Sequence, residues 1–200
     1  MASLQRLTKT QLIKLESILA AQDAPVVQHL QPGASSTALT TVEGFLGMPV
    51  PDELRQWWEW HDGTDIQPHE RAEKGLVGPL FQILSTARAI EFSRKLRGFA
   101  VEDAADDPDE LWGSTWIAIG SQGRVACECN VEKSAPVPVL NVDYHKVDRP
   151  GETAAHSLGE MVSWWIEALE SGAWRYDPEH DRWDRHEELI PRERESKCLV

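Results

Sequence analysis

The spacing of apolar residues changes along the chain, and this change restricts the fold more than any other feature. Apolar residues recur at helical spacing through most of the first hundred residues. From residue 114 onward, β-branched and aromatic residues form two extended segments around a Ser-Gln-Gly turn, and a third follows at 136–145. One more helical pattern occupies 157–172. Because the strands follow one another directly, the sequence predicts an α+β fold, a mostly antiparallel sheet packed with about four helices.

The length of 200 residues is typical of a single domain. We expect an N-terminal helix and loop at 1–37, the main domain at 38–176 and a charged, flexible tail at 177–200. No stretch has the apolar core of a signal peptide or the length of a membrane span, and three cysteines are too few for a disulfide scaffold. The expectation is a cytoplasmic protein that does not bind a membrane.

The charge is strongly negative, with 20 basic and 33 acidic residues and a net charge of −13. The first hundred residues are nearly balanced, with 10 Lys and Arg against 11 Asp and Glu, so the excess lies in the second hundred. Such a chain repels phosphate backbones, which excludes direct nucleic-acid binding as a favoured function. Its field instead attracts a basic protein partner.

The acidic residues are densest in the run EDAADDPDE, where six of nine residues are acidic. One interpretation is a loop that is simply solvated, which is how most like-charge runs behave. The other is a surface that steers a basic partner toward the protein. The candidate partner-binding residues are Glu102, Asp103, Asp106, Asp107, Asp109 and Glu110.

The segment PDELRQWWEWHDG is the most strongly signalled helix. Pro51 and the two acidic residues after it suit a helix start. Leu54, Trp57 and Trp58 share one helical face, so we expect them in the core. Gly63 is placed to end the helix.

Candidate catalytic and metal-binding residues are few. Cys127 and Cys129 lie two apart on a predicted strand, but there is no second such pair, so we interpret them as buried structural cysteines. Asp62 and Asp65 flank Gly63, which is typical of a turn and also permits an acid–base pair. The seven histidines have no metal-site spacing. The sequence therefore predicts no enzyme activity, no metal site and no cofactor.

Three motifs in order resemble the SUKH superfamily of Smi/Knr-type domains. The segment LGMPVPDELRQWWEWHDG is similar to the family's Leu-Pro-x-(Asp/Glu)-Leu helix, which continues into aromatic residues and an Asp-Gly or Asn-Gly. WIAIGSQG followed by VACECN is similar to its hairpin, and SLGEMVSWWIEALESGAWRYD to its late helix and strand. The resemblance covers residues 40–176; an extra proline and a long acidic loop depart from it. The positions of the first motif are Pro51, Leu54, Trp57, Trp58, Asp62 and Gly63.

The resemblance implies a single α+β domain with a binding role and no catalysis. Bacterial members are commonly immunity proteins that neutralise toxins, often nucleases or deaminases. Fungal relatives are regulators of cell-wall assembly. We therefore expect an immunity protein that binds a basic toxin domain, with an intracellular scaffold or regulator as the alternative. An enzyme that uses Asp62 and Asp65 is a third, less favoured hypothesis.

Overall fold

The computed structural model describes residues 5–65, 72–79, 81–103, 107–120, 124–142 and 151–190. The α-helices are α1 (Lys9–Ala21), α2 (Val26–His29), α3 (Ser36–Leu46), α4 (Asp52–Trp60), α5 (Thr86–Asp103) and α6 (Leu158–Glu170). Short 3₁₀ turns are η1 (Ala72–Gly75), η2 (Pro108–Glu110) and η4 (Glu187–Leu189). The strands are β1 (Leu76–Val77), β2 (Phe81–Gln82), β3 (Trp116–Gly120), β4 (Val125–Glu128), β5 (Val139–Val142), β6 (Gly151–Ala155), β7 (Trp174–Asp177) and β8 (Arg182–Arg185).

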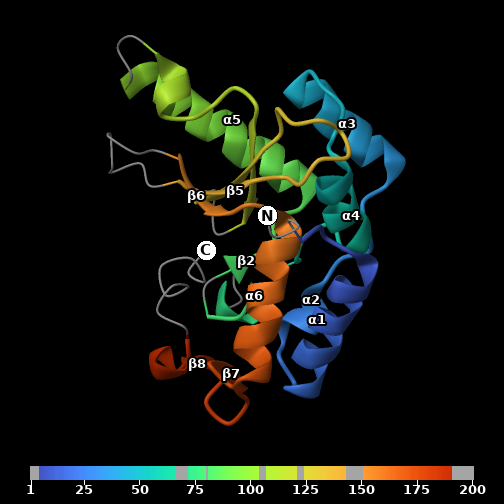
Figure 1. The fold of residues 1–200 in the computed structure, drawn as a ribbon, viewed down its shortest axis with the longest axis vertical. Helices are drawn as coiled ribbons and strands as arrows, with labels where there is room; N and C mark the ends of the chain where they lie inside the picture. Colours follow the sequence, from blue (N-terminus) through green and yellow to red (C-terminus); the bar gives the residue numbers. More distant parts are fainter. Residues whose placement is uncertain are drawn as a thin grey trace.

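The central sheet has the order β3-β4-β5-β6, and each neighbouring pair is antiparallel. Two further antiparallel hairpins, β1-β2 and β7-β8, are separate from it, and Figure 1 shows β7-β8 at the end of α6 far from the sheet. The α+β class with a mostly antiparallel sheet is therefore confirmed. Figure 1 shows α5 across one side of the sheet, with α3 beside it, and α1 alongside α6 on the other side.

The helix ends are set by residues close to them in the sequence. Thr8 and Gln11 form a capping box at the start of α1. Ser157 caps α6 by accepting from the Glu160 backbone N–H at 2.8 Å. Gly47 ends α3 with a left-handed φ of 70°. These local signals fix where the helices stop.

An aromatic cluster joins the helical and sheet parts of the core. The rings of Trp57 on α4 and Trp165 on α6 lie 6.1 Å apart, and Phe81 on β2 lies 4.5 Å from Trp165. All three side chains are buried. Strands β3 and β4 are buried on both faces, because helices cover both sides of the sheet. The fold thus builds one continuous core.

Several elements depart from the sequence-based expectation. Helix α3 begins at Ser36, inside the segment expected to be a loop, because the Ser35 hydroxyl caps it. Helix α5 continues to Asp103, into the run of acidic residues interpreted as a loop. Strand β6 was not expected. The predicted start of the charged tail at residue 177 falls inside the β7-β8 hairpin, and residues 191–200 of that tail lie outside the described residues. Within the described part of the chain, no helix has the length and apolar character that a bilayer crossing requires.

Candidate partner-binding surface

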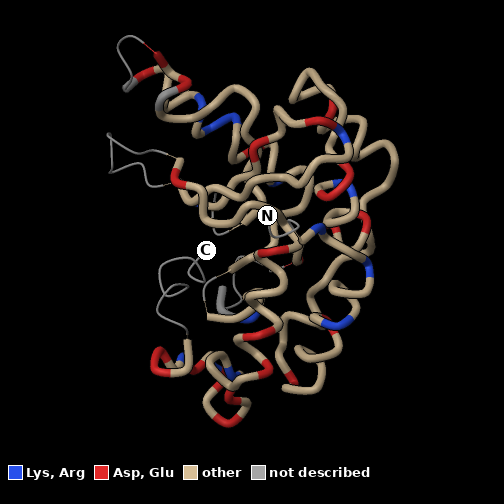
Figure 2. The backbone as a smooth tube through the Cα atoms, in the orientation of Figure 1, with Lys and Arg blue, Asp and Glu red and all other residues tan. Residues whose placement is uncertain are grey.

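The acidic run lies at the far end of α5 and in the turn that follows. Glu102 and Asp103 belong to the last turn of α5, and Asp109 and Glu110 belong to η2. Figure 2 shows acidic residues gathered where this helix end projects from the body of the protein. We call this group the acidic end of α5. Asp106 lies outside the described residues.

Three carboxylates of the acidic end have described side chains, and all are exposed: Glu102, Asp107 and Asp109. Asp107 accepts from the backbone N–H of Asp109 at 3.0 Å, and Asp109 accepts from the Ser114 hydroxyl at 3.0 Å. Among the described residues, no Lys or Arg forms an ion pair with these three carboxylates. Their negative field therefore extends into the solvent.

The position of these acids opposes helix stability. The last turn of α5 contains no basic residue, and the C-terminal end of a helix carries partial negative charge. A carboxylate placed there is destabilising by a few tenths of a kcal/mol to about 1 kcal/mol. The cations of α5 have other partners: Arg88 pairs with Glu91, Arg94 lies over the Phe45 ring, and Arg97 donates to the Ser114 carbonyl at 3.3 Å. The acidic end is thus not explained by stability.

The helix motif in α4, in contrast, is buried. Pro51 is the residue before α4 and Leu54, Trp57 and Trp58 lie in the core. The Trp58 indole N–H donates to the Leu84 carbonyl at 3.2 Å, which ties α4 to the segment before α5. These residues hold the fold together and are not available to a partner.

Asp62 and Gly63 join the end of α4 to the start of α5. The Asp62 carboxylate accepts from the Thr86 backbone N–H at 2.6 Å and from the Thr86 hydroxyl at 3.2 Å. Gly63 has φ +80°, and an added Cβ would lie 2.3 Å from the Ser85 nitrogen, so the site admits only glycine. Asp62 therefore stabilises the N-terminus of α5, an interaction that turn chemistry alone did not predict.

Asp65 lies near the edge of the described segment. Its backbone N–H donates to the His29 carbonyl at 2.9 Å, and its own carbonyl is 3.1 Å from His29 Nδ1. These contacts fasten the chain after α4 to the end of α2. Asp62 faces the N-terminus of α5 instead, so the two residues have different partners.

Glu53 is the buried carboxylate that sequence reasoning missed. It is 3% exposed. One oxygen accepts from the Leu7 backbone N–H at 2.5 Å and the other from the Val137 backbone N–H at 2.6 Å. The carboxylate thus joins the N-terminal segment, α4 and the segment before β5. Glu53 occupies the Asp/Glu position of the Leu-Pro-x-(Asp/Glu)-Leu motif, and this position could have indicated its role. The charge of Glu53 by itself indicates only a preference for the start of a helix.

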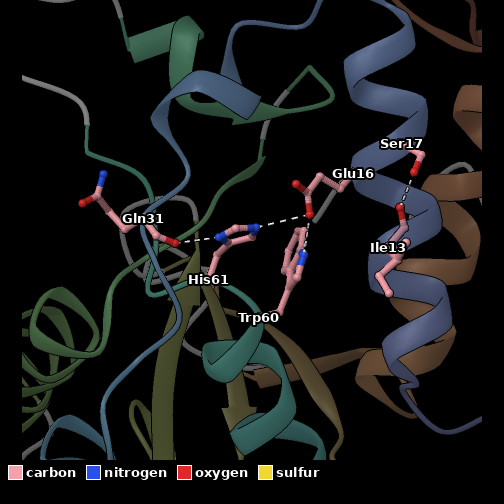
Figure 3. Close-up of polar contacts among 6 residues, drawn as sticks. All are labelled: Ile13, Glu16, Ser17, Gln31, Trp60 and His61. Atoms are coloured by element: carbon pink, nitrogen blue, oxygen red, sulfur yellow. Dashed lines mark hydrogen bonds and ion pairs between the residues drawn. The ribbon is translucent and has the colours of Figure 1, made fainter.

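A second polar cluster joins α1 to the end of α4 (Figure 3). Glu16 accepts from the Trp60 indole N–H at 3.0 Å and lies 3.3 Å from His61 Nε2. The Nδ1 of His61 donates to the Gln31 carbonyl at 2.6 Å. Both ring nitrogens of His61 are therefore occupied within the protein, which argues against a role in proton transfer to a substrate.

Cys127 on β4 and Cys129, just after that strand, are buried free thiols. Burial, with the nearby Cys129 and the carboxylates of Glu53 and Glu128, raises the pKa of the Cys127 thiol well above its usual value. Burial raises the pKa of Cys129 in the same way. A thiol kept protonated is a poor nucleophile and a poor metal ligand. Among the described residues, no group of three or more His, Cys, Asp or Glu side chains could hold a metal ion.

Comparison with known protein families identifies the family of this chain. Residues 33–163 match the model of the SMI1 / KNR4 family (SUKH-1). The chain belongs to the SMI1 / KNR4 family. None of the curated proteins compared with the chain matches it.

The part of the chain that matches the SMI1 / KNR4 family includes both regions described above. It begins just before α3, contains α4 and the acidic end of α5, and ends within α6. Helices α1 and α2 and the β7-β8 hairpin lie outside it. The resemblance inferred from the three motifs is therefore confirmed, and the buried motif in α4 is part of the family fold in this chain.

Proposed function

We propose that this SMI1 / KNR4 protein is a non-catalytic protein-binding module, an immunity protein that neutralises a basic toxin of nuclease or deaminase type by direct binding. The observation that carries the proposal is the acidic end of α5. It is exposed, has no described cationic partner within the chain and lies where negative charge opposes helix stability. Charge that does not serve the fold is available for recognition.

The electrostatics of such a complex are favourable. Enzymes that act on nucleic acids carry basic surfaces because they bind phosphates. A net charge of −13 attracts such a surface over a distance, and the acidic end of α5 would be the point of contact. Attraction of this kind acts mainly on the association rate and weakens as salt screens it.

Two features support a function without catalysis. Asp62, one member of the possible acid–base pair, is engaged in capping α5, and both ring nitrogens of His61 are engaged within the chain. The buried thiols of Cys127 and Cys129 have raised pKa values, which opposes nucleophilic attack. These groups hold the fold together, so the proposal assigns no reaction to them.

The test begins with a search for a toxin-domain gene beside the gene for this chain, and then measures protection of bacterial cells that express that toxin domain. Co-expression of the chain restores growth if the proposal is right. A variant with Glu102→Gln, Asp107→Asn and Asp109→Asn protects less, whereas the matched variant with Glu152→Gln, Glu187→Gln and Glu188→Gln protects as the parent does. Both variants must show the parent's circular dichroism spectrum.

Two outcomes would contradict the proposal. Growth that the parent chain does not restore would favour a scaffold or regulator without a toxin partner. Equal protection by both charge variants would remove the acidic end of α5 from the binding surface.

A further inference from the structure

Helix α5 is exposed around nearly its whole circumference over residues 97–102. Residues 97–99, 101 and 102 are exposed, and Ala100 is the buried residue among them, at 2%. The helix end therefore projects beyond the layer that covers the rest of α5 (Figure 1). A partner can reach it from more than one side.

Two large apolar residues lie on this exposed turn. Phe99 is 45% exposed and Val101 is 60% exposed. The structure describes only two other exposed large apolar side chains, Ile13 and Leu189, and each lies in a different part of the fold. Residues two apart on a helix point to nearly opposite sides, so Phe99 shares its side of α5 with Lys95 and Glu102, whereas Val101 lies on another side.

The Phe99 ring already has a cation on one face. The ammonium of Lys95 lies over this ring, 5.7 Å from its centroid. A cation is attracted to an aromatic face, and the attraction becomes stronger when both are shielded from water. Glu102 follows Phe99 by three residues, and the exposed Asp107 and Asp109 follow in the next turn. Apolar, aromatic and acidic contacts are thus combined on one helix end.

We propose that the end of α5 from Phe99 to Glu102, with Asp107 and Asp109, is a docking surface for a basic protein surface that carries apolar side chains between its cations, and that Phe99 is its apolar contact. The inference rests on the proposed function and names the chemistry of the partner: cations for the carboxylates and the ring face, and apolar side chains for Phe99. Charge alone attracts any cation, whereas this combination selects among basic partners.

A second copy of the chain does not fit this surface. Each chain carries a net charge of −13, and the exposed cations of this part of α5, Lys95 and Arg97, already have partners within the chain. Like charges face to face are repulsive, so self-association through this turn is disfavoured. A basic partner is therefore the occupant that the charges select.

The experiment compares two fluorescent synthetic peptides. One contains Lys and Leu in equal number, and in the other every Leu is replaced by Ser, so that the two have the same charge. Fluorescence anisotropy measures their binding to the parent chain and to its variants at low salt. The parent is expected to bind the Lys/Leu peptide more tightly than the Lys/Ser peptide.

The variants separate apolar contacts from charge. Phe99→Gln is expected to weaken binding of the Lys/Leu peptide about five- to tenfold, because the variant lacks the apolar ring that would be buried against the Leu side chains. Its binding of the Lys/Ser peptide is expected to change by less than about twofold. Val101→Gln, at an exposed apolar residue on another side of the same helix end, is expected to change neither peptide by more than about twofold. Ile13→Gln, at an exposed apolar residue on α1, changes neither peptide.

The outcomes distinguish this inference from the proposed function. If Glu102→Gln, Asp107→Asn and Asp109→Asn weaken both peptides but Phe99→Gln changes neither, the surface is purely electrostatic and the inference is wrong. If the charge variant binds both peptides as tightly as the parent does, the acidic end of α5 does not bind basic partners. The proposed function is then left without its contact surface. Dimerisation of the parent that Phe99→Gln abolishes, measured by sedimentation, would assign the surface to a second copy.

Discussion

Helix α4 and the end of helix α5 are opposite cases within one domain. In α4, Leu54, Trp57 and Trp58 are fully buried, and even the carboxylate of Glu53 is buried with both oxygens bonded. At the end of α5, the described carboxylates are exposed and have no cationic partner among the described residues. Both regions lie in the part of the chain that matches the family.

This difference separates residues that make the fold from residues that are free to recognise a partner. A change in α4 removes a contact that another part of the chain requires. A change at the acidic end of α5 alters the field around the protein and leaves the core intact. Stability and binding should therefore respond to different mutations, and four predictions test this.

The largest effect on stability is expected for Trp57→Ala. The Trp57 ring contacts Trp165 and Phe81 at the junction of three elements, so its removal leaves a cavity. Large-to-small changes of this kind lower the free energy of unfolding by about 3–5 kcal/mol. Denaturant unfolding measures the change, and Glu59→Ala, at an exposed position of α4, is the control. A Trp57→Ala variant as stable as its parent would show that the packing of α4 in the core does not stabilise the fold.

A smaller loss is expected for Glu53→Gln. The amide keeps one acceptor oxygen but presents N–H donors where the carboxylate accepted, so one of the backbone N–H groups of Leu7 and Val137 loses its partner. An unsatisfied buried donor lowers the stability by about 1–3 kcal/mol. Asp52→Asn, the adjacent residue in the same helix turn, controls for lost charge at the helix start. Equal effects of the two changes would mean that the buried hydrogen bonds contribute nothing.

Asp62→Ala should lower the stability by about 1 kcal/mol, the usual effect of losing a helix cap. Asp62→Asn keeps an oxygen that can accept from the Thr86 backbone N–H, so it should lower the stability less. Thermal unfolding of the two variants measures the difference. Protection against the toxin should survive in both variants once they are shown to be folded, and its loss from a folded Asn variant would move Asp62 into the functional site.

The smallest effect on stability, and the reverse sign, is expected for neutralisation of Asp106, Asp107, Asp109 and Glu110. Fewer negative charges beyond a helix C-terminus should leave the stability unchanged or raise it by less than about 0.5 kcal/mol. The association rate with a basic partner should fall at low salt, and the difference should shrink as salt increases. Stopped-flow kinetics measures the rate. An unchanged rate at low salt would show that the run is merely solvated.

Much of this fold could be predicted from the sequence because the helix ends and the first hairpin carry local signals. The helix ends are set by hydrogen bonds or backbone conformations within a few residues, as at Thr8 with Gln11, at Ser157 and at Gly47. Strands β3 and β4 pair because a short connection joins them. Strand β6 has no such signal. Its sequence, GETAA, has little β propensity, so its pairing with β5 depends on the assembled sheet.

The candidate site divides in the same way. The acidic run and the aromatic motif were visible in the sequence because each is a local concentration of one residue type. The role of Glu53 was not, since its partners lie 46 and 84 residues away in the chain. The contact between Asp62 and Thr86 was hidden for the same reason. The exposure of Phe99 depended on how far α5 continues past the body of the protein, which helical spacing alone did not show.

The packing of α1 on α6 has a consequence for synthesis on the ribosome. The Gln11 side chain donates to the Gly159 carbonyl at 3.1 Å and to the Ser163 hydroxyl at 2.8 Å, across more than 140 residues of sequence. At about 5–20 residues translated per second, α1 waits about 7–30 s before its partner helix has been made. During that interval Leu12, Leu15 and Leu19, which are buried in the finished fold, lack the surface of α6. Helix α1 therefore completes its packing only after α6 has been synthesised.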